Sequence, residues 1–265
     1  MEIINWQEKL IPYEQGIKEI ICKFENYEMA FLQKNMPSPI ESVKGRIKST
    51  SSILEKARRK DIPINEIWNK IEDIAGVRII CRFVKDIDLV VEHIRSRTGF
   101  DLTILEEKDY VKNTKSSGYR SYHLILRYKV MLPEGVVEIP IEIQIRTMAM
   151  DFWATIEHSL KYKYAGNIPG HIQERLVASA NAAFNMDMEM STIRHEIFEV
   201  QEMVKYKDML IKEILRDIQK LVLNENIELA NEYNSKFFKI DFEKDIDALK
   251  GLREDIRIAT YAYQI

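Results

Sequence analysis

Between residues 141 and 146 the chain alternates apolar and polar side chains without a break. Isoleucines stand at 141, 143 and 145, and Glu142, Gln144 and Arg146 fill the positions between and after them. Successive side chains of a β-strand point to opposite faces of the sheet. The segment therefore predicts a strand that buries its isoleucines in a core and presents an acid, an amide and a guanidinium on its other face.

Other segments place this strand in an order of elements. Helical spacing covers residues 5–34, alternation covers 43–48, and a second helix runs to about residue 60. The pattern then predicts a strand over 74–83, a helix over 86–97, a strand over 101–110, a polar loop over 112–120, and a hairpin of 121–130 with 136–146. Beyond residue 147 the chain is typical of helix, with breaks near 167–170, 223–226 and 234–241.

This order predicts an α+β (mixed α/β) fold in which helices flank a mixed sheet. We expect one domain over residues 1–204 and a helical C-terminal extension over 205–265. The extension is amphipathic, which favours packing or self-association over a second activity.

Composition limits the class of protein. Apolar residues make up 46% and charged residues 31%, as in folded soluble domains, and a net charge of −3 gives no general attraction to nucleic acid. Cys22 and Cys81 cannot form a disulfide framework, so we expect two reduced, buried thiols. Glu2 stands where a signal peptide would be basic, and no stretch approaches the roughly 18 apolar residues of a membrane span. We expect a cytoplasmic protein without membrane contact.

The first candidate site is the basic segment 43–60, in which seven basic residues accompany one acid. The members that would share one strand face are Lys44, Arg46 and Lys48. The members that would share one side of the following helix are Ser52, Lys56 and Arg59. A helix amino terminus also directs free N–H groups toward an anion. The segment is either a triphosphate cradle or a solvated basic face. The chain has neither G-x-x-x-x-G-K-[ST] nor G-x-G-x-x-G, so phosphate would not be held by those glycine-rich loops.

Two acids on separate strands form the second candidate site. Asp73 directly precedes an apolar strand, and Glu142 lies on the alternating one. Mg²⁺ binds oxygen ligands from one or two carboxylates together with substrate phosphates. Each acid could instead cap a strand end or pair with an arginine, and Arg78 could pair with either a phosphate or a carboxylate.

The third candidate site is the polar loop 115–123, which contains Gly118 and runs into a strand. Tyr119 could stack on a purine, as aromatic side chains do on bases. Lys115 and His123 flank it, although a single histidine on a strand is more commonly just hydrogen-bonded.

Together these segments resemble one family. The runs that carry the resemblance are GRIKS (45–49), SILEKARRK (52–60), DIAGVR (73–78), SGYRSYH (117–123), EIQIRT (142–147) and FWATIEH (152–158). They are similar, in this order, to the synthetase domain of RelA/SpoT proteins, and in particular to small alarmone synthetases of the RelQ type (GTP pyrophosphokinases). The resemblance covers about residues 6–200.

The resemblance implies a nucleotidyltransferase-like sheet, a homotetramer, and Mg²⁺ as cofactor. It implies transfer of pyrophosphate from ATP to the 3′-hydroxyl of GDP or GTP, which makes ppGpp or pppGpp and releases AMP. By motif position, the residues that would contact ATP are Arg46, Lys48, Ser52, Lys56, Arg59 and Arg78. Asp73 and Glu142 would hold the metal, and Glu142 would also accept the proton of the attacking hydroxyl. The residues that would contact GDP or GTP are Lys115, Tyr119, His123, Gln144 and Asp151, with Tyr119 stacked on guanine.

Some features depart from the family pattern or leave choices open. No histidine is followed by aspartate, the dipeptide of the hydrolase domain in bifunctional relatives, so we expect synthesis without hydrolysis. Asp151 stands where relatives often carry asparagine, which leaves the preference for GDP or GTP open. Single-stranded RNA or (p)ppGpp could regulate an enzyme of this type.

Two rival functions stay open. One is a relative that pyrophosphorylates tRNA or forms (p)ppApp. The other is an RNA-binding regulator that uses the same basic surface, which the acidic net charge and the paired acids disfavour.

Overall fold

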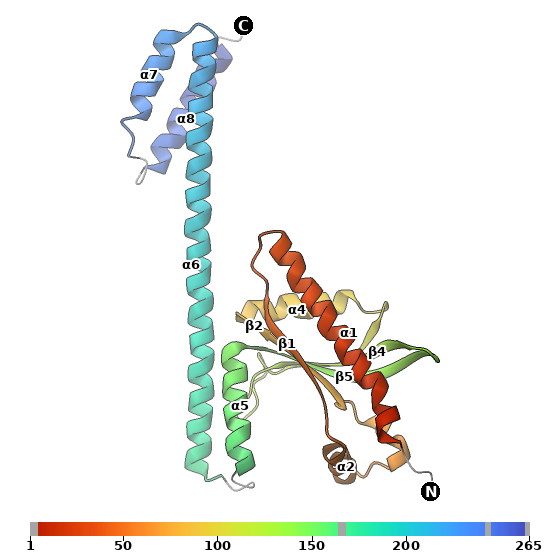
Figure 1. Cartoon of the computed structure of the whole chain (residues 1–265). Helices are drawn as coiled ribbons and strands as arrows, with labels where there is room; N and C mark the ends of the chain where they lie inside the picture. The colour runs from red at the N-terminus through yellow and green to blue at the C-terminus, as the bar shows by residue number, and fades with distance from the viewer. Residues whose placement is uncertain (1–4, 164–167, 242–244, 263–265) are drawn as a thin grey trace. The chain divides into compact units, whose positions relative to one another are not determined.

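The structure is a computed structural model that describes residues 5–163, 168–241 and 245–262. The chain divides into two compact units, Met1–Ser191 and Thr192–Ile265, and each has a hydrophobic core of its own (Figure 1). The division lies within the helix α6 (Gly170–Leu223). The domain boundary that we expect at 204/205 stays a prediction.

A five-stranded mixed sheet forms the centre of the first unit. Its strands are β1 (Ile40–Ile47), β2 (Ala75–Cys81), β3 (Leu102–Asp109), β4 (Tyr122–Leu132) and β5 (Gly135–Thr147). Their order in the sheet is β1-β2-β5-β4-β3; β2 and β5 are parallel, and all other neighbours are antiparallel. The alternating segment is thus the middle strand, and the mixed α+β fold is confirmed.

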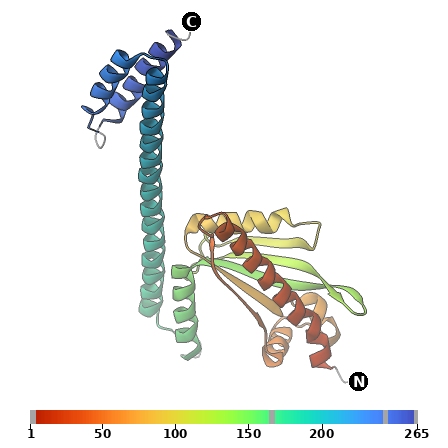
Figure 2. The ribbon, with the colours of Figure 1, turned by 45° about the horizontal axis from the view of Figure 1, so that its top comes forward.

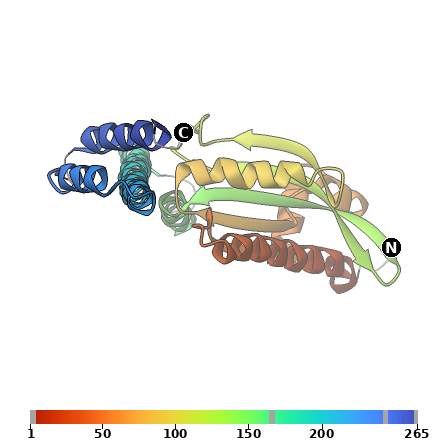
Figure 3. The ribbon, with the colours of Figure 1, turned by 90° about the horizontal axis from the view of Figure 1, so that it is seen from above.

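Helices α1 (Trp6–Gln33) and α4 (Val84–Ser96) cover one face of this sheet (Figure 2). They run along the strands (Figure 3). The ring of Tyr27 in α1 stacks on His93 in α4 with centroids 3.9 Å apart. Gly45 allows α1 to approach β1, because a Cβ atom there would lie 2.2 Å from Cγ2 of Ile17. The isoleucines of β5 are buried beneath these helices, so its polar side chains occupy the opposite face.

Shorter helices complete the first unit. Helix α2 (Thr50–Arg59) begins after Ser49, whose Oγ accepts a hydrogen bond from the Ser52 amide at 3.3 Å. The 3₁₀ helix η1 (Ile64–Glu66) and the helix α3 (Ile67–Lys70) were not predicted, because each is too short to show a helical period. Helix α5 (Met148–Lys163) follows β5 directly.

The second unit consists of α6 from Thr192 onward, α7 (Ile227–Phe237) and α8 (Ile246–Ala262). The buried residues of its core include Leu210, Ile214, Leu221, Phe237, Leu249 and Ile256. The breaks predicted near 223–226 and 234–241 are confirmed, since α6 ends at Leu223 and α7 at Phe237. The predicted break at 167–170 falls partly on residues 164–167, which lie outside the described residues.

The expectation of two buried thiols is half wrong. Cys81 is buried, but Cys22 is exposed. Cys22 lies on the side of α1 away from the sheet, while Ile17, Ile20 and Phe24 form the buried side. Within the described parts of the chain, no helix has the length and apolar character needed to cross a membrane.

Candidate active site

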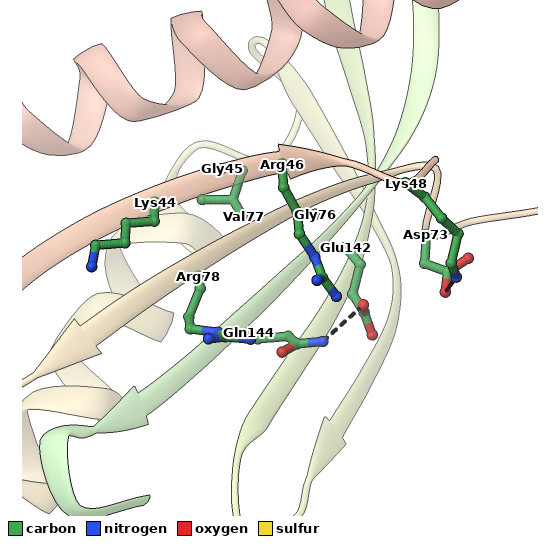
Figure 4. A pocket seen from close by; sticks show the side chains of 10 residues that line it. All are labelled: Lys44, Gly45, Arg46, Lys48, Asp73, Gly76, Val77, Arg78, Glu142 and Gln144. Carbon is green, nitrogen blue, oxygen red and sulfur yellow. Dashed lines mark hydrogen bonds and ion pairs between the residues drawn. The ribbon is translucent and has the colours of Figure 1, made fainter. Parts of the chain in front are cut away.

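A cleft of about 250 Å³ opens on the face of the sheet away from α1 (Figure 4). The residues that line it are Lys44, Gly45, Arg46, Lys48, Asp73, Gly76, Val77, Arg78, Glu142 and Gln144. Among the side chains are four cations and two carboxylates. Such a surplus of positive charge around a pair of acids suits a polyphosphate that carries a divalent cation.

Strand register explains why distant residues meet in the cleft. Arg46, Gly76 and Glu142 are neighbours across β1, β2 and β5. Because Gly76 has no side chain, the floor between the guanidinium and the carboxylate is open (Figure 4). The next row places Lys44, Arg78 and Gln144 side by side in the same way.

Asp73 is held by two lysines at one end of the cleft. Its Oδ2 lies 2.6 Å from Nζ of Lys48, and its Oδ1 lies 2.7 Å from Nζ of Lys56. Burial by itself would raise the pKa of Asp73, but the hydrogen bonds from Lys48 and Lys56 outweigh it and hold the pKa below its ordinary value. The acid is therefore a stable anion with cations on both oxygens.

Glu142 is the second acid of the cleft, and its side chain is mostly buried. His123 Nδ1 lies 3.0 Å from Oε1, and Gln144 Nε2 donates to Oε2 at 2.9 Å. Burial and the charge of Asp73 raise the pKa of Glu142, but the contacts with His123 and Gln144 bring it below its ordinary value. Because the two acids influence each other across one cleft, a divalent cation between them would relieve their repulsion. Among the described residues, no cluster of three or more His, Cys, Asp and Glu could hold a metal, so the remaining ligands would be substrate oxygens.

The polar loop, residues 112–120, lies beside Glu142. The Tyr119 hydroxyl is 2.8 Å from His123 Nε2, and Lys115 Nζ lies 4.9 Å from the centre of the Tyr119 ring. Gly118 adopts a φ of +86°, and a Cβ atom there would lie 2.6 Å from that of Ala180 in α6. The loop is thus anchored against the start of α6 within the first unit.

Asp151 connects two arginines rather than lining the cleft. Its Oδ1 lies 3.1 Å from Nη1 of Arg78 and 3.2 Å from Nη1 of Arg146. Burial and the charges of Arg146 and Arg46 lower the pKa of Arg78, which shows how crowded with cations this side of the cleft is. An anionic ligand would stabilise that arrangement.

The structure brings most of the predicted site residues together. Those that line the cleft are Arg46, Lys48, Asp73, Arg78, Glu142 and Gln144. Those that contact this group through ion pairs or hydrogen bonds are Lys56, His123 and Asp151. Tyr119 reaches it through its contact with His123. Lys115 packs over Tyr119 and, at 4.2 Å, over the ring of Tyr110. In the parts of the chain that the structure describes, neither Ser52 nor Arg59 lines the cleft, and their roles stay predictions.

Several residues near the site were not predicted from the sequence to contact a substrate, among them Lys44, Gly76, Tyr110 and Arg146. Lys44 and Gly76 line the cleft, Tyr110 packs against Lys115, and Arg146 contacts Tyr119 and Gln144. The period of β1 already placed Lys44 beside Arg46, and that of β5 placed Arg146 beside Gln144. No local pattern marked Tyr110.

Comparison with known proteins finds relatives among the GTP pyrophosphokinases. The sequence model described as "Region found in RelA / SpoT proteins" matches residues 45–167. GTP pyrophosphokinase YjbM of Bacillus subtilis is 47% identical over 201 residues, which cover 76% of this chain and 94% of that protein. GTP pyrophosphokinase YwaC of the same organism is 38% identical over 195 residues, which cover 73% of this chain and 92% of that protein.

Solved structures agree with the sequence comparison. Small alarmone synthetase 1 from Bacillus subtilis, bound to its product pppGpp, superposes with a TM-score of 0.68 at 47% identity, covering 72% of this chain and 97% of that one. The same synthetase bound to AMPCPP gives a TM-score of 0.64 at 45% identity, covering 73% and 98%.

Proposed function

This chain belongs to the RelA/SpoT family, and we propose that it is a GTP pyrophosphokinase that makes (p)ppGpp, the alarmone of the stringent response. It transfers the pyrophosphate group of ATP to the 3′-hydroxyl of GDP or GTP and releases AMP. The observation that carries this proposal is the cleft in which Lys44, Arg46, Lys48 and Arg78 face Asp73 and Glu142. The relatives bound to pppGpp and to AMPCPP support the same substrate classes.

The chemistry needs two reactants in line more than it needs a covalent intermediate. Arg46, Lys48 and Arg78 would bind the triphosphate, with Ser52, Lys56 and Arg59 completing the ATP site. The 3′-oxygen attacks the β-phosphorus, the bond from that phosphorus to the bridging α,β-oxygen breaks, and AMP leaves with the electron pair. Arginine and lysine charges stabilise the negative charge on the transferred group and on the leaving oxygen.

Glu142 would accept the hydroxyl proton. General bases of this kind contribute typically about 10²–10⁴-fold to the rate. Lys115, Tyr119, His123, Gln144 and Asp151 would form or support the acceptor site, with the Tyr119 ring against guanine.

Asp73 and Glu142 would hold Mg²⁺ together with phosphate oxygens, because two acids facing a cationic cleft fit a hard cation. The ion would neutralise charge on the polyphosphate and orient it. When the triphosphate binds, Lys48 and Lys56 gain a second anion to pair with, and the oxygens of Asp73 become available. Removal of divalent cations by EDTA should abolish turnover, and excess Mg²⁺ should restore it.

We also propose a homotetramer. In the second unit, α6 presents Ile193, Ile197, Val200 and Val204 at the alternating four- and three-residue spacing of a helix interface. Their exposed fractions are 37%, 54%, 61% and 48%. A stripe of large apolar side chains on an uncovered helix face supports self-association. Regulation by (p)ppGpp or single-stranded RNA stays a prediction, and we propose a cytoplasmic location, where nucleotide substrates are supplied.

One experiment tests the activity and its nearest rivals together. The full chain is incubated with ATP labelled in the β-phosphate and with one acceptor per reaction: GDP, GTP, AMP or tRNA. The products are separated by chromatography. We expect label in ppGpp and pppGpp. Label in tRNA or only in adenosine products would contradict the proposal, as would RNA binding in EDTA without any turnover. Purified pppGpp should remain intact with the enzyme, since we propose no hydrolase activity.

A further inference from the structure

One guanidinium lies behind the acceptor site without lining the cleft. Arg146 is 5% exposed and is the second-last residue of β5, two residues after Gln144. Its Nη2 donates to the Tyr119 hydroxyl oxygen at 2.5 Å and to Oε1 of Gln144 at 2.8 Å. Its other nitrogens contact Ser121 Oγ at 3.3 Å and Asp151 Oδ1 at 3.2 Å, so its charge is paired in the interior.

Two arms of hydrogen bonds run from Arg146 to the two oxygens of Glu142. One arm passes through Gln144, whose Nε2 donates to Oε2 of Glu142 at 2.9 Å. The other passes through Tyr119 and His123, with separations of 2.8 Å between Tyr119 Oη and His123 Nε2 and 3.0 Å between His123 Nδ1 and Glu142 Oε1. Both arms therefore end on the same carboxylate.

The chemistry of arginine sets the direction of both arms. A guanidinium has five donors and no acceptor, so Tyr119 and Gln144 must each offer it an oxygen. With Oε1 of Gln144 facing Arg146, the amide nitrogen must face Glu142. With the Tyr119 oxygen accepting from Arg146, its hydrogen is free for His123 Nε2. In a neutral imidazole the other nitrogen then carries the proton, which points at Glu142.

We propose that Arg146 is a positioning residue for the general base, acting through Tyr119, His123 and Gln144 rather than through any substrate. It selects the amide orientation of Gln144 and the Nδ1–H tautomer of His123, and both then donate to Glu142. The two donors hold the carboxylate in one plane, and its remaining lone pairs would be available to the hydroxyl and to a metal. This inference rests on the proposed function, because it assigns Glu142 the role of base.

The first test reads the tautomer in the absence of substrate. In the full chain labelled with ¹⁵N-histidine, the ring nitrogen shifts distinguish the Nδ1–H and Nε2–H forms, and His123→Gln identifies the His123 signals. We expect the Nδ1–H form in the unmodified protein and a shift toward Nε2–H in Arg146→Met. An Nε2–H ring or a doubly protonated ring in the unmodified protein, or no change in Arg146→Met, would overturn the proposal. This readout is informative whether or not the chain makes (p)ppGpp, so its failure and failure of the proposed function can be told apart.

The second test separates positioning from packing by kinetics. Arg146→Met should lower kcat about 100-fold, within the range that a general base contributes, and leave KM for ATP nearly unchanged. Arg146→Lys keeps the charge, but its side chain ends one bond short of the position of Nη2, from which both arms start, so it should restore little of kcat. Recovery of kcat by lysine, or a loss confined to KM for ATP, would contradict positioning.

A further pair of variants covers the case in which Arg146→Met does not fold, since it leaves Asp151 with one fewer cation. Tyr119→Phe keeps the ring and removes one arm, and Gln144→Leu removes the other. Each should lower kcat, and Tyr119→Phe should also shift the His123 tautomer. Unchanged kcat in Tyr119→Phe together with an unchanged His123 spectrum would overturn the proposal independently of Arg146.

Discussion

The Lys48 ammonium lies 2.6 Å from Oδ2 of Asp73, so the acid proposed as a metal ligand is paired with a cation before substrate arrives. Lys56 occupies the other oxygen at 2.7 Å. This arrangement keeps Asp73 ionised in a half-buried place and prepares the two lysines to move toward a triphosphate. Asp73 is therefore the residue at which loss of charge should have the largest consequence.

Asp73→Asn should lower kcat by at least about 100-fold, because an amide keeps the shape of the side chain but not the charge that binds the divalent cation. The loss of kcat is measured from the turnover of ATP and GDP under saturating Mg²⁺. The matched control is Asp247→Asn, whose side chain is 92% exposed on α8 and which should retain activity. Retention of most activity by Asp73→Asn would refute its role as a metal ligand.

Tyr119→Ala should raise KM for GDP or GTP by about tenfold or more, since base–aromatic stacking contributes ~1–3 kcal/mol. KM for ATP should change much less. Tyr119→Phe is the control that keeps the ring, and it should preserve KM for the acceptor. Equal effects of the alanine variant on both KM values would count against stacking.

Gly45→Ala should lower the free energy of unfolding by about 1–3 kcal/mol, because overpacking of a core interface costs this much. The new methyl would meet Cγ2 of Ile17 at 2.2 Å and push α1 from β1. Urea unfolding measures the change, and Gly170→Ala, with no atom within 4 Å of its new Cβ, is the control.

The clash can be checked with a second substitution. Ile17→Ala should cost less in the Gly45→Ala background than alone, because it makes room for the added methyl. Additive costs would show that the two residues do not oppose each other.

Acid stability should depend on Asp101, which pairs with Lys23 at 2.5 Å and with Arg97. Burial raises its pKa, but the hydrogen bonds from Arg97 and Lys23 outweigh this, so the folded pKa lies below the model-peptide value of 3.8. Because the pKa of Asp101 is lower in the folded state than in the unfolded state, its ionised form stabilises the fold. This stabilisation is present above about pH 4 and is lost as the pH falls through the pKa of the folded state. Asp101→Asn should therefore be less stable at pH 7 and show a weaker loss of stability between pH 4 and pH 2. An acid slope equal to that of the unmodified protein would contradict this.

Removal of residues 206–265 should leave the pyrophosphate transfer intact, because the cleft is built wholly from the first unit. Turnover and light scattering on the truncated chain measure activity and assembly separately. Inactivity of a folded truncation that assembles as the full chain does would show that the extension takes part in the reaction.

Residue periodicity predicted the faces of the strands correctly. Spacing alone placed Lys44, Arg46 and Lys48 on one face, at β1 and the residue that follows it. It also placed Glu142 and Gln144 on one face of β5. All five residues line the cleft. Alternation works here because one face of the sheet is buried under α1 and α4 and the other is not.

Relations between strands could not be predicted in that way. Gly76 lies between Arg46 and Glu142 only because β2 pairs with both β1 and β5, a non-local arrangement that no single segment contains. The contacts of Arg146 depend on the polar loop and on the first turn of α5. The strand face on which Arg146 lies was therefore predictable, but its partners were not. η1 and α3 were missed because packing, rather than a repeating pattern, specifies so few residues.

The contact between Gly118 and Ala180 has a consequence for how this protein can change over time. The two positions are sixty-two residues apart, yet the 2.6 Å available to a Cβ atom leaves no space for one methyl more. Sequence change in this loop is therefore constrained by a helix that lies far from it in the sequence. Any residue larger than glycine at position 118 would require α6 to move, because alanine at position 180 is already the smallest residue that carries a Cβ atom.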